Sequence, residues 1–282
     1  MDRVLLVGIN KYPGNSLYGC VNDITDMANF LKETCGFAMN SIRLLTDGRA
    51  TKAAIVERLN LLVNGARPGD RLLFHYSGHG AQMPTRNPAA EVDKLDEVIC
   101  PVDFDWSDEH AIRDKEFYKI FATVPEGVEF IWISDSCHSG DLTREFPQLK
   151  PDHYHKTIMP PEDINWRLQT ARELQVRNPS KIQTTTMSSA VKALNVALIS
   201  GCKSDETSED ALFNNRPNGA LTYFLLKELN SANGLKAPLA DVVKKVAKAV
   251  ATYSKTQHPQ LEGSKEIAKK PFAARKENLH VG

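Results

Sequence analysis

The stretch "VEFIWISDSCHSGD", residues 128–141, runs from an apolar segment into a turn that carries a cysteine. A short apolar run bounded by turn residues predicts a buried strand, and Cys137 follows its end, with Gly140 three positions later. A cysteine at this place can be a nucleophile, a metal ligand or a small buried residue. The rest of the chain has to separate these three interpretations.

A second apolar segment has the same form. The sequence "LLFHYSGHGAQ", residues 72–82, ends in a glycine-rich turn that carries His79. Ligands of open parallel sheets bind outside the carboxyl ends of the strands, so we expect both turns at one edge of a sheet. A thiol beside an imidazole can attack a carbonyl, and the imidazolium can then protonate the leaving amine. The pair predicts a cysteine hydrolase whose oxyanion hole is formed by the backbone amides of Gly80 and Cys137.

Other residues near these turns have simpler interpretations. His75 is expected to be structural, because it alternates with Tyr76 along the strand. His138 adjoins the cysteine, and adjacent residues seldom point at each other. A lone cysteine at a strand end is more often a small buried residue than a catalyst. The pairing of the two turns is what favours catalysis by His79 and Cys137.

The remaining pattern predicts an α/β domain with a largely parallel sheet. Apolar strands are expected at 3–9, 41–47, 70–76, 128–134 and 195–200, and helices at 20–37, 220–229 and 239–253. Thr51 is expected to cap a further helix, and Asn22 or Asp23 can cap the first.

A linker is expected at 142–189, where prolines and basic residues replace sustained periodicity, with about one helical turn near 164–175. It separates a larger part, 1–141, from a smaller part, 190–282. Because both parts contribute strands, we favour one domain, 1–282, with a long insertion.

Composition describes an ordinary globular chain of 282 residues, 41% apolar and 25% charged. Lys plus Arg and Asp plus Glu are both 35, so no global charge indicates a nucleic-acid or membrane partner. The odd and scattered cysteines argue against disulfides and a zinc cage, which favours a reducing cytoplasm. The apolar run at the N-terminus is too short for a signal peptide, and no stretch is long enough to span a bilayer. The cysteines are Cys20, Cys35, Cys100, Cys137 and Cys202.

The motifs together resemble the caspase-like cysteine peptidases of family C14, closest to the metacaspases and their prokaryotic relatives, the orthocaspases. The separation of His79 and Cys137, 137 − 79 = 58 residues, is near the roughly 50 typical of caspases. The resemblance extends over nearly the whole chain and implies a caspase-like α/β/α sandwich with a mainly parallel six-stranded sheet. It also implies that His79 is the general base and Cys137 the nucleophile. The matching segments are "GCVND", "HYSGHG", "VICPVDF", "DSCHSG", "ISGCKSDETSED", "NGALTYFLLKEL" and "HPQLEG".

The resemblance further implies an acidic specificity pocket that accepts Arg or Lys before the scissile bond (position P1) of protein or peptide substrates. The matching carboxylates are Asp23 and Asp135, with Cys20 and Ser77 lining the same pocket. Two carboxylates can hold a guanidinium by paired hydrogen bonds, which disfavours an acidic P1 side chain. Without the resemblance, Asp23 could be a helix cap and Asp135 could bind a loop amide. Metacaspases also tend to be monomers, so we expect a monomer.

This sequence departs from the metacaspase pattern at the calcium-binding carboxylates and at Glu206. Calcium-dependent metacaspases bind the ion with several carboxylates, but Lys115 follows Asp114 where a second Asp is expected, and Arg144 stands at another Asp position. Asp93, Asp96 or Asp141 could contribute, yet two basic residues disfavour the site, so we expect no metal and no cofactor. Glu206 stands where the family usually has Gln, in an acidic segment, residues 205–210, that either shapes the substrate groove or is a solvated loop.

A peptidase specific for basic residues can cut its own linker, because nicking concentrates in exposed loops. Lys150 and Lys156 are among the basic residues of this linker at which such a cut is expected, and the alternative is a solvated linker that stays intact. The competing functions are a catalytically silent binding protein and a caspase-fold hydrolase of a small amide or ester. The candidate cleavage positions are Arg144, Arg167, Arg172, Arg177 and Lys181.

Overall fold

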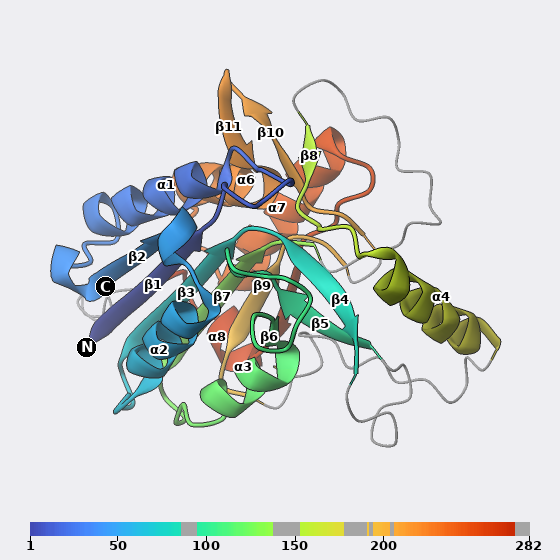
Figure 1. Cartoon of the computed structure of the whole chain (residues 1–282). Helices are drawn as coiled ribbons and strands as arrows, with labels where there is room; N and C mark the ends of the chain where they lie inside the picture. The colour runs from blue at the N-terminus through green and yellow to red at the C-terminus, as the bar shows by residue number, and fades with distance from the viewer. Residues whose placement is uncertain (86–94, 138–152, 178–190, 192–193, 204–205, 274–282) are drawn as a thin grey trace, which may run out of the picture.

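The computed structural model describes residues 1–85, 95–137, 153–177, 191, 194–203 and 206–273 (Figure 1). Its centre is a six-stranded sheet in the order β12-β9-β7-β3-β1-β2. Neighbouring strands are parallel except β12, which runs antiparallel to β9 at the edge. The strands are β1 (Asp2–Gly8), β2 (Ile42–Thr46), β3 (Arg71–Ser77), β7 (Glu129–Asp135), β9 (Ala197–Ser200) and β12 (Gln260–Gly263).

Both faces of this sheet are apolar and both are covered by helices. Along β1, Leu5 and Val7 face one core, while Val4 and Leu6 face the other, as the two-residue period of a strand requires. Helices α2 (Lys52–Val63) and α3 (Asp114–Phe121) cover the first face. The structure therefore confirms the predicted α/β/α sandwich with a mainly parallel six-stranded sheet. The second face is covered by α1 (Cys20–Glu33), α6 (Ala220–Leu229), α7 (Leu239–Tyr253) and α8 (Lys265–Ala268).

Only one of the helix caps predicted from the sequence is present in the structure. Thr51 caps α2 as predicted, because its side chain accepts a hydrogen bond from the Ala54 amide at 3.3 Å. Helix α1 begins after Gly19 with no side-chain cap, so the caps predicted for its start are wrong. Asn22 instead donates to the Pro217 carbonyl, and Asp23 is fully buried and points toward Gly219.

Two small sheets flank the carboxyl ends of the central strands. One has the order β4-β5-β6 and the other β11-β10-β8. The bounds of these strands are β4 (Gly80–Pro84), β5 (Leu95–Ile99), β6 (Ile112–Arg113), β8 (Tyr154–His155), β10 (Glu209–Phe213) and β11 (Arg216–Gly219). Two short 3₁₀ segments, Met39–Ser41 and Asp47–Arg49, precede and follow β2.

The predicted linker is more ordered than expected within its described part. It contributes β8 to the small sheet and forms α4 (Glu162–Arg177), a helix of 16 residues where we predicted about one turn. In Figure 1, α4 lies at the side of the molecule near β4. Leu168 of α4 packs against Leu95 of β5. Residues 142–152 and 178–189 lie outside the described residues, and the division at 141 and 190 stays a prediction.

No helix in the described ranges is long and apolar enough to cross a membrane.

Candidate active site

Strands β3 and β7 bring the two glycine-rich turns together. They run side by side in parallel register, with Ser77 opposite Asp135 at their carboxyl ends. His79 and Cys137 each follow two residues later, so both emerge at the same edge of the sheet. Both side chains are buried, which keeps bulk water from their reactive atoms.

A carbonyl fixes the orientation of the His79 ring. Nε2 lies 2.7 Å from the carbonyl oxygen of Asn15, so in a neutral imidazole Nε2 carries the proton. Nδ1 is buried and has no hydrogen-bond partner among the described residues, which leaves it as the basic nitrogen. Burial lowers the pKa of His79 to about 4, so the ring is neutral at physiological pH. No motif points to Asn15, because its backbone carbonyl and not its side chain makes the contact.

The Cys137 thiol donates to the carbonyl oxygen of Glu206 at 2.9 Å. Cys202 donates to the same oxygen at 3.4 Å, so a second thiol lies beside the candidate nucleophile. The hydrogen bond with Cys137 and burial together raise the pKa of Cys202 well above its usual value. The carboxylate of Glu206 pairs with His258 at 2.7 Å, so this part of the acidic segment is not a free solvated loop.

The two amides expected in the oxyanion hole donate to a single carbonyl oxygen. The amide of Gly80 lies 3.0 Å and that of Cys137 3.2 Å from the carbonyl oxygen of Lys156. Two convergent backbone N–H groups are the arrangement that stabilises a developing oxyanion. Both amides therefore bind Lys156, a residue of the predicted linker.

The side chain of Lys156 enters the predicted pocket. Its Nζ lies 3.0 Å from Asp135 Oδ1 and 3.3 Å from Asp23 Oδ2, and it donates to Ser77 Oγ at 2.9 Å. None of Lys156 is exposed, contrary to our expectation of an exposed basic linker. The predicted pocket residues Asp23, Asp135 and Ser77 thus meet around one ammonium group. Cys20 is buried beside them, and burial raises its pKa although Lys156 opposes the shift.

Hydrogen bonds hold the Asp135 carboxylate in place. Asp135 accepts from Ser208 Oγ at 2.8 Å and from the amide and hydroxyl of Thr222 at 3.0 and 2.8 Å. Burial alone would raise the pKa of Asp135, but the Lys156 ammonium and these donors leave it below its usual value. Asp135 therefore carries a fixed negative charge in the pocket.

Asp23 is held less strongly in its ionised form. It accepts from the Gly219 amide at 2.9 Å and from the Asn218 side chain at 3.0 Å. Burial raises its pKa to about 6, even though Lys156 opposes the shift. Burial likewise opposes the charge of Lys156, yet the surrounding carboxylates raise the pKa of this lysine well above its usual value. The pocket therefore stabilises a cation.

Sequence reasoning missed two pocket residues. The sequence places Asp210 in a segment that is either groove or solvated loop. In the structure it is 1% exposed and accepts from the Gly19 amide at 3.0 Å, and its charge favours the ammonium of Lys156. Gly219 forms part of the wall, because a Cβ there would lie 2.1 Å from Lys156 Nζ. Asp210 lies within the segment "TSED" and Gly219 within "NGAL", but only the fold places these two residues at the pocket.

Two of the carboxylates considered for calcium, Asp96 and Asp114, lie within the described residues. The two carboxylate oxygens of Asp96 bind Lys115 at 3.0 Å and Arg113 at 2.5 Å. Burial raises the pKa of Asp114 to about 8, so this group is mostly protonated at neutral pH. Within the described ranges, no cluster of His, Cys, Asp and Glu could hold a metal ion. Asp93, Asp141 and Arg144 lie outside the described residues.

Three of the five candidate cleavage positions lie in a helix. Arg167, Arg172 and Arg177 lie in α4, whose backbone would have to unwind before a peptidase could bind it in extended form. Arg144 and Lys181 lie outside the described residues.

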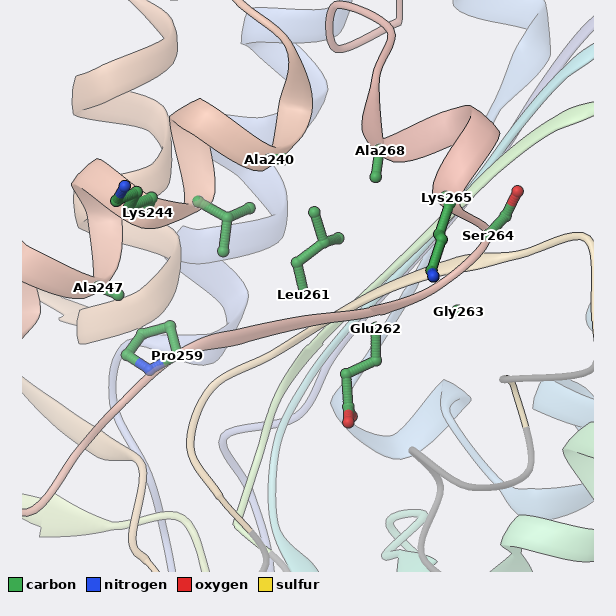
Figure 2. Close-up of a pocket in the computed structure, with 11 residues that line it drawn as sticks. Ala240, Lys244, Ala247, Pro259, Leu261, Glu262, Gly263, Ser264, Lys265 and Ala268 are labelled. Carbon is green, nitrogen blue, oxygen red and sulfur yellow. The ribbon is translucent and has the colours of Figure 1, made fainter.

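A separate hollow lies between α7, β12 and α8 on another part of the surface (Figure 2). Leu261 and Val243 contribute apolar side chains, and Lys244, Lys265 and Glu262 contribute polar ones. None of the predicted site residues lines it.

Comparison with known proteins gave concordant findings. Residues 2–144 match the metacaspase, peptidase C14 domain. Metacaspase-1 of Scheffersomyces stipitis is 33% identical over 254 residues, covering 81% of this chain and 62% of that protein. Metacaspase-1A of Aspergillus fumigatus is 32% identical over 252 residues, covering 80% and 60%. The chain thus spans about three fifths of these relatives. A solved structure of a Geobacter sulfurreducens protein superposes with a TM-score of 0.66 at 25% identity, covering 96% of this chain and 97% of that one.

Proposed function

This chain belongs to the metacaspases of peptidase family C14, and we propose that it is a cysteine endopeptidase that cleaves after lysine or arginine. The observation that carries the proposal is the position of Lys156. Its ammonium lies between Asp135 and Asp23 while its carbonyl oxygen accepts both oxyanion-hole amides. A basic P1 residue would bind in the same way.

The dyad supplies the chemistry. His79 Nδ1 takes the proton of the Cys137 thiol, and the sulfur attacks the carbonyl carbon of the P1 residue. The amides of Gly80 and Cys137 stabilise the oxyanion, and losing one such donor typically costs about 10²–10³ in rate. His79 then returns the proton to the leaving amine, and water hydrolyses the thioester. The hydrogen bond from Nε2 to Asn15 holds the ring in the tautomer that this sequence of steps requires.

The pocket favours a basic P1 residue on electrostatic grounds. An uncharged side chain would leave Asp135 buried without a counter-charge, and an acidic one would repel it. Extended backbone pairs with β10 beside the site, which favours a peptide over a small amide or ester as the substrate.

We also propose that activity does not require calcium. Lys115 already supplies a positive charge to Asp96, and Arg113 binds the other oxygen of the same carboxylate. A cytoplasmic location and a monomeric state stay predictions from the sequence.

The test uses four peptides that differ only in Lys, Arg, Asp or Leu at P1. They are incubated with wild type and with Cys137→Ala, each with added calcium or with chelator. We expect cleavage of the Lys and Arg peptides by wild type alone, at equal rates with and without calcium. Equal cleavage of the Leu peptide would refute the basic specificity, and activity in Cys137→Ala would refute the dyad.

A further inference from the structure

We propose that Cys137 and Cys202 form a reversible disulfide when the chain meets a small peroxide such as hydrogen peroxide. The inference rests on the proposed function for the role of Cys137 as nucleophile, and it adds a modification site at which Cys202 is the second sulfur. All five cysteines are free and buried in the structure, so the chain described above is the reduced form.

Neighbouring strands of the central sheet bring the two cysteines together. Strands β7 and β9 are parallel, with Ser134 opposite Ser200, and the Gly201 amide donates to the Ser134 carbonyl at 2.9 Å. Cys137 and Cys202 follow this pair by three and two residues. Paired strands lie about 4.8 Å apart, within the range of about 4.4–6.8 Å between the Cα atoms of disulfide-bonded cysteines. The two residues therefore leave the sheet at a spacing that a disulfide spans.

The side-chain contacts show that the two sulfur atoms converge. Cys137 Sγ donates to the carbonyl oxygen of Glu206 at 2.9 Å, and Cys202 Sγ donates to the same oxygen at 3.4 Å. Cys202 Sγ also lies 3.8 Å from the carbonyl oxygen of Ser136, the residue before the nucleophile. The thiols are hydrogen-bonded to each other as well. Because they are in contact, no other side chain has to leave before an S–S bond forms.

The surroundings of this pair differ from those of the other cysteines. Buried cysteines usually serve as small apolar residues, and three of the five do so here. Cys20 and Cys100 pack in the core on one face of the sheet, and Cys35 packs in the core on the other. Within the described residues, Cys137 and Cys202 belong to neither core, and their sulfurs meet backbone carbonyls. Space filling therefore does not account for Cys202.

The environments of the two thiols determine which one reacts first. His79 Nδ1 takes the proton of Cys137, which makes this sulfur a nucleophile toward a peroxide as well as toward a peptide. The hydrogen bond with Cys137 and burial raise the pKa of Cys202 well above its usual value, so Cys202 stays a thiol. Cys137 is thus the sulfur that the peroxide oxidises, and Cys202 is the sulfur that completes the disulfide.

Both steps balance with the peroxide as the only oxidant. The Cys137 sulfur attacks one peroxide oxygen, the O–O bond breaks, and the departing hydroxide takes the proton held by His79 to become water. The Cys202 sulfur then attacks the sulfur of the sulfenic acid on Cys137, and the S–O bond breaks. This second hydroxide takes the Cys202 proton and also leaves as water. The two sulfurs have lost two electrons in total, and the peroxide oxygens have gained them.

The disulfide stops peptide cleavage and protects the nucleophile. While it is bonded to Cys202, the Cys137 sulfur cannot attack a carbonyl carbon. Without a neighbouring thiol, a sulfenic acid is oxidised further to sulfinic and sulfonic acids, which thiols do not reduce. A dithiol such as dithiothreitol reduces the disulfide by exchange and restores both thiols. The pair therefore makes inactivation by peroxide reversible.

Burial selects the size of the oxidant. Cys137 is 0% and Cys202 7% exposed, so a two-oxygen peroxide reaches these sulfurs more readily than the much larger glutathione disulfide. At equal concentration, hydrogen peroxide should therefore form the disulfide at least about tenfold faster than glutathione disulfide does. Equal rates with the two oxidants would overturn the assignment of a small peroxide.

The experiment maps the disulfide directly. The reduced full chain is freed of reductant, treated with hydrogen peroxide, alkylated under denaturing conditions and digested without reductant. Wild type should give one cross-linked peptide pair that contains Cys137 and Cys202, with the other three of the five cysteines alkylated. Cleavage of the Lys peptide should fall with the same time course as the cross-link appears, and dithiothreitol should restore it. Oxidation of Cys137 without any cross-link to Cys202 would overturn the inference.

Two variants of Cys202 test its protective role. Cys202→Ser keeps a hydroxyl that can donate to Glu206, and Cys202→Ala serves if the serine variant does not fold. Each protein is compared with its own activity before oxidation. After peroxide and then dithiothreitol, the variants should recover at least about fivefold less of their activity than wild type does, with Cys137 found as sulfinic or sulfonic acid. Equal recovery in the variants and in wild type would refute the role of Cys202.

Cys35→Ser is the matched control. Cys35 is 7% exposed, the same fraction as Cys202, but it packs in the core on the second face of the sheet. This variant should form the cross-link and recover its activity as wild type does. A loss of recovery in Cys35→Ser equal to that in Cys202→Ser would overturn the pairing, because removal of any buried thiol would then have the same effect.

The mass readout separates this inference from the proposed function. If peptides are cleaved but no cross-link forms, the chain is a peptidase and the disulfide is wrong. If the cross-link forms in a chain that cleaves none of the four peptides, the modification site stands and the proposed function fails.

Discussion

Replacing Asp135 with Asn isolates the charge that selects a basic P1 residue. The substitution keeps the shape of the side chain and leaves an oxygen that can still accept from Thr222, but removes the negative charge 3.0 Å from the ammonium. We would make it in Lys156→Ala, in which the Lys156 ammonium no longer fills the pocket. The paired substrates carry Lys or its uncharged analogue norleucine at P1.

The size of the effect follows from the contact distance. Two unit charges 3.0 Å apart attract by about 5.5 kcal/mol at an effective dielectric constant of about 20. Removing one partner of a buried ion pair typically costs about 3–5 kcal/mol. At 1.36 kcal/mol per factor of ten, kcat/KM for the Lys peptide should fall by about 10²–10⁴.

The norleucine peptide provides the internal control. It has no charge to lose, so Asp135→Asn should change its kcat/KM by less than about tenfold. A fall of equal size for both peptides would refute the electrostatic reasoning, because it would mean that Asp135 supports the catalytic loop and not the P1 cation. Asp23→Asn should cost less than Asp135→Asn at pH 6, since the pKa of Asp23 is about 6 and half its charge is already lost there.

Three further measurements test the site. As the pH falls through about 6, protonation of Asp23 should raise KM for Lys peptides. Asp23→Asn should make KM less dependent on pH. His79, with a pKa of about 4, does not titrate in that range. Gly219→Val should abolish cleavage of Lys peptides, because a Cβ there would lie 2.1 Å from the position of the Lys156 ammonium. Gly48→Ala, where a Cβ meets nothing within 4 Å, should behave as wild type. Calcium should leave the melting temperature unchanged, because Lys115 occupies the Asp96 carboxylate; an increase that saturates with calcium would contradict this.

The central sheet could be predicted from the sequence because each strand carries its own signal. Apolar runs such as 70–76 and 128–134 are buried on both faces, and the helices between them show a regular apolar stripe. Helix α4 was underestimated because its apolar contact is narrow: Leu168 is its one fully buried side chain among those described. A helix held by so little packing gives only a weak periodic signal.

The candidate site was predictable to the extent that motifs carry it. His79 and Cys137 follow strands that are adjacent in the sheet, so local sequence placed them correctly at one edge. Lys156 could not be identified in this way, because its position depends on the pairing of β8 with β10, more than 50 residues further along the chain. Among several basic residues in one linker, only that long-range pairing distinguishes the one that enters the pocket.

The charges of the pocket determine which side chains it can hold. Asp23 and Asp135 lie beside a single ammonium, and the charge of Asp210 also favours it, so the fold places more negative charge there than Lys156 can neutralise. When Lys156 leaves, buried carboxylates lose their counter-charge, and the pocket then favours either protonation or another cation. The force that holds Lys156 in place is therefore the force that later selects a basic substrate. A substitution that weakens it, such as Asp210→Asn, should therefore raise KM for Lys peptides, because it removes one of the charges that favour an ammonium in the pocket.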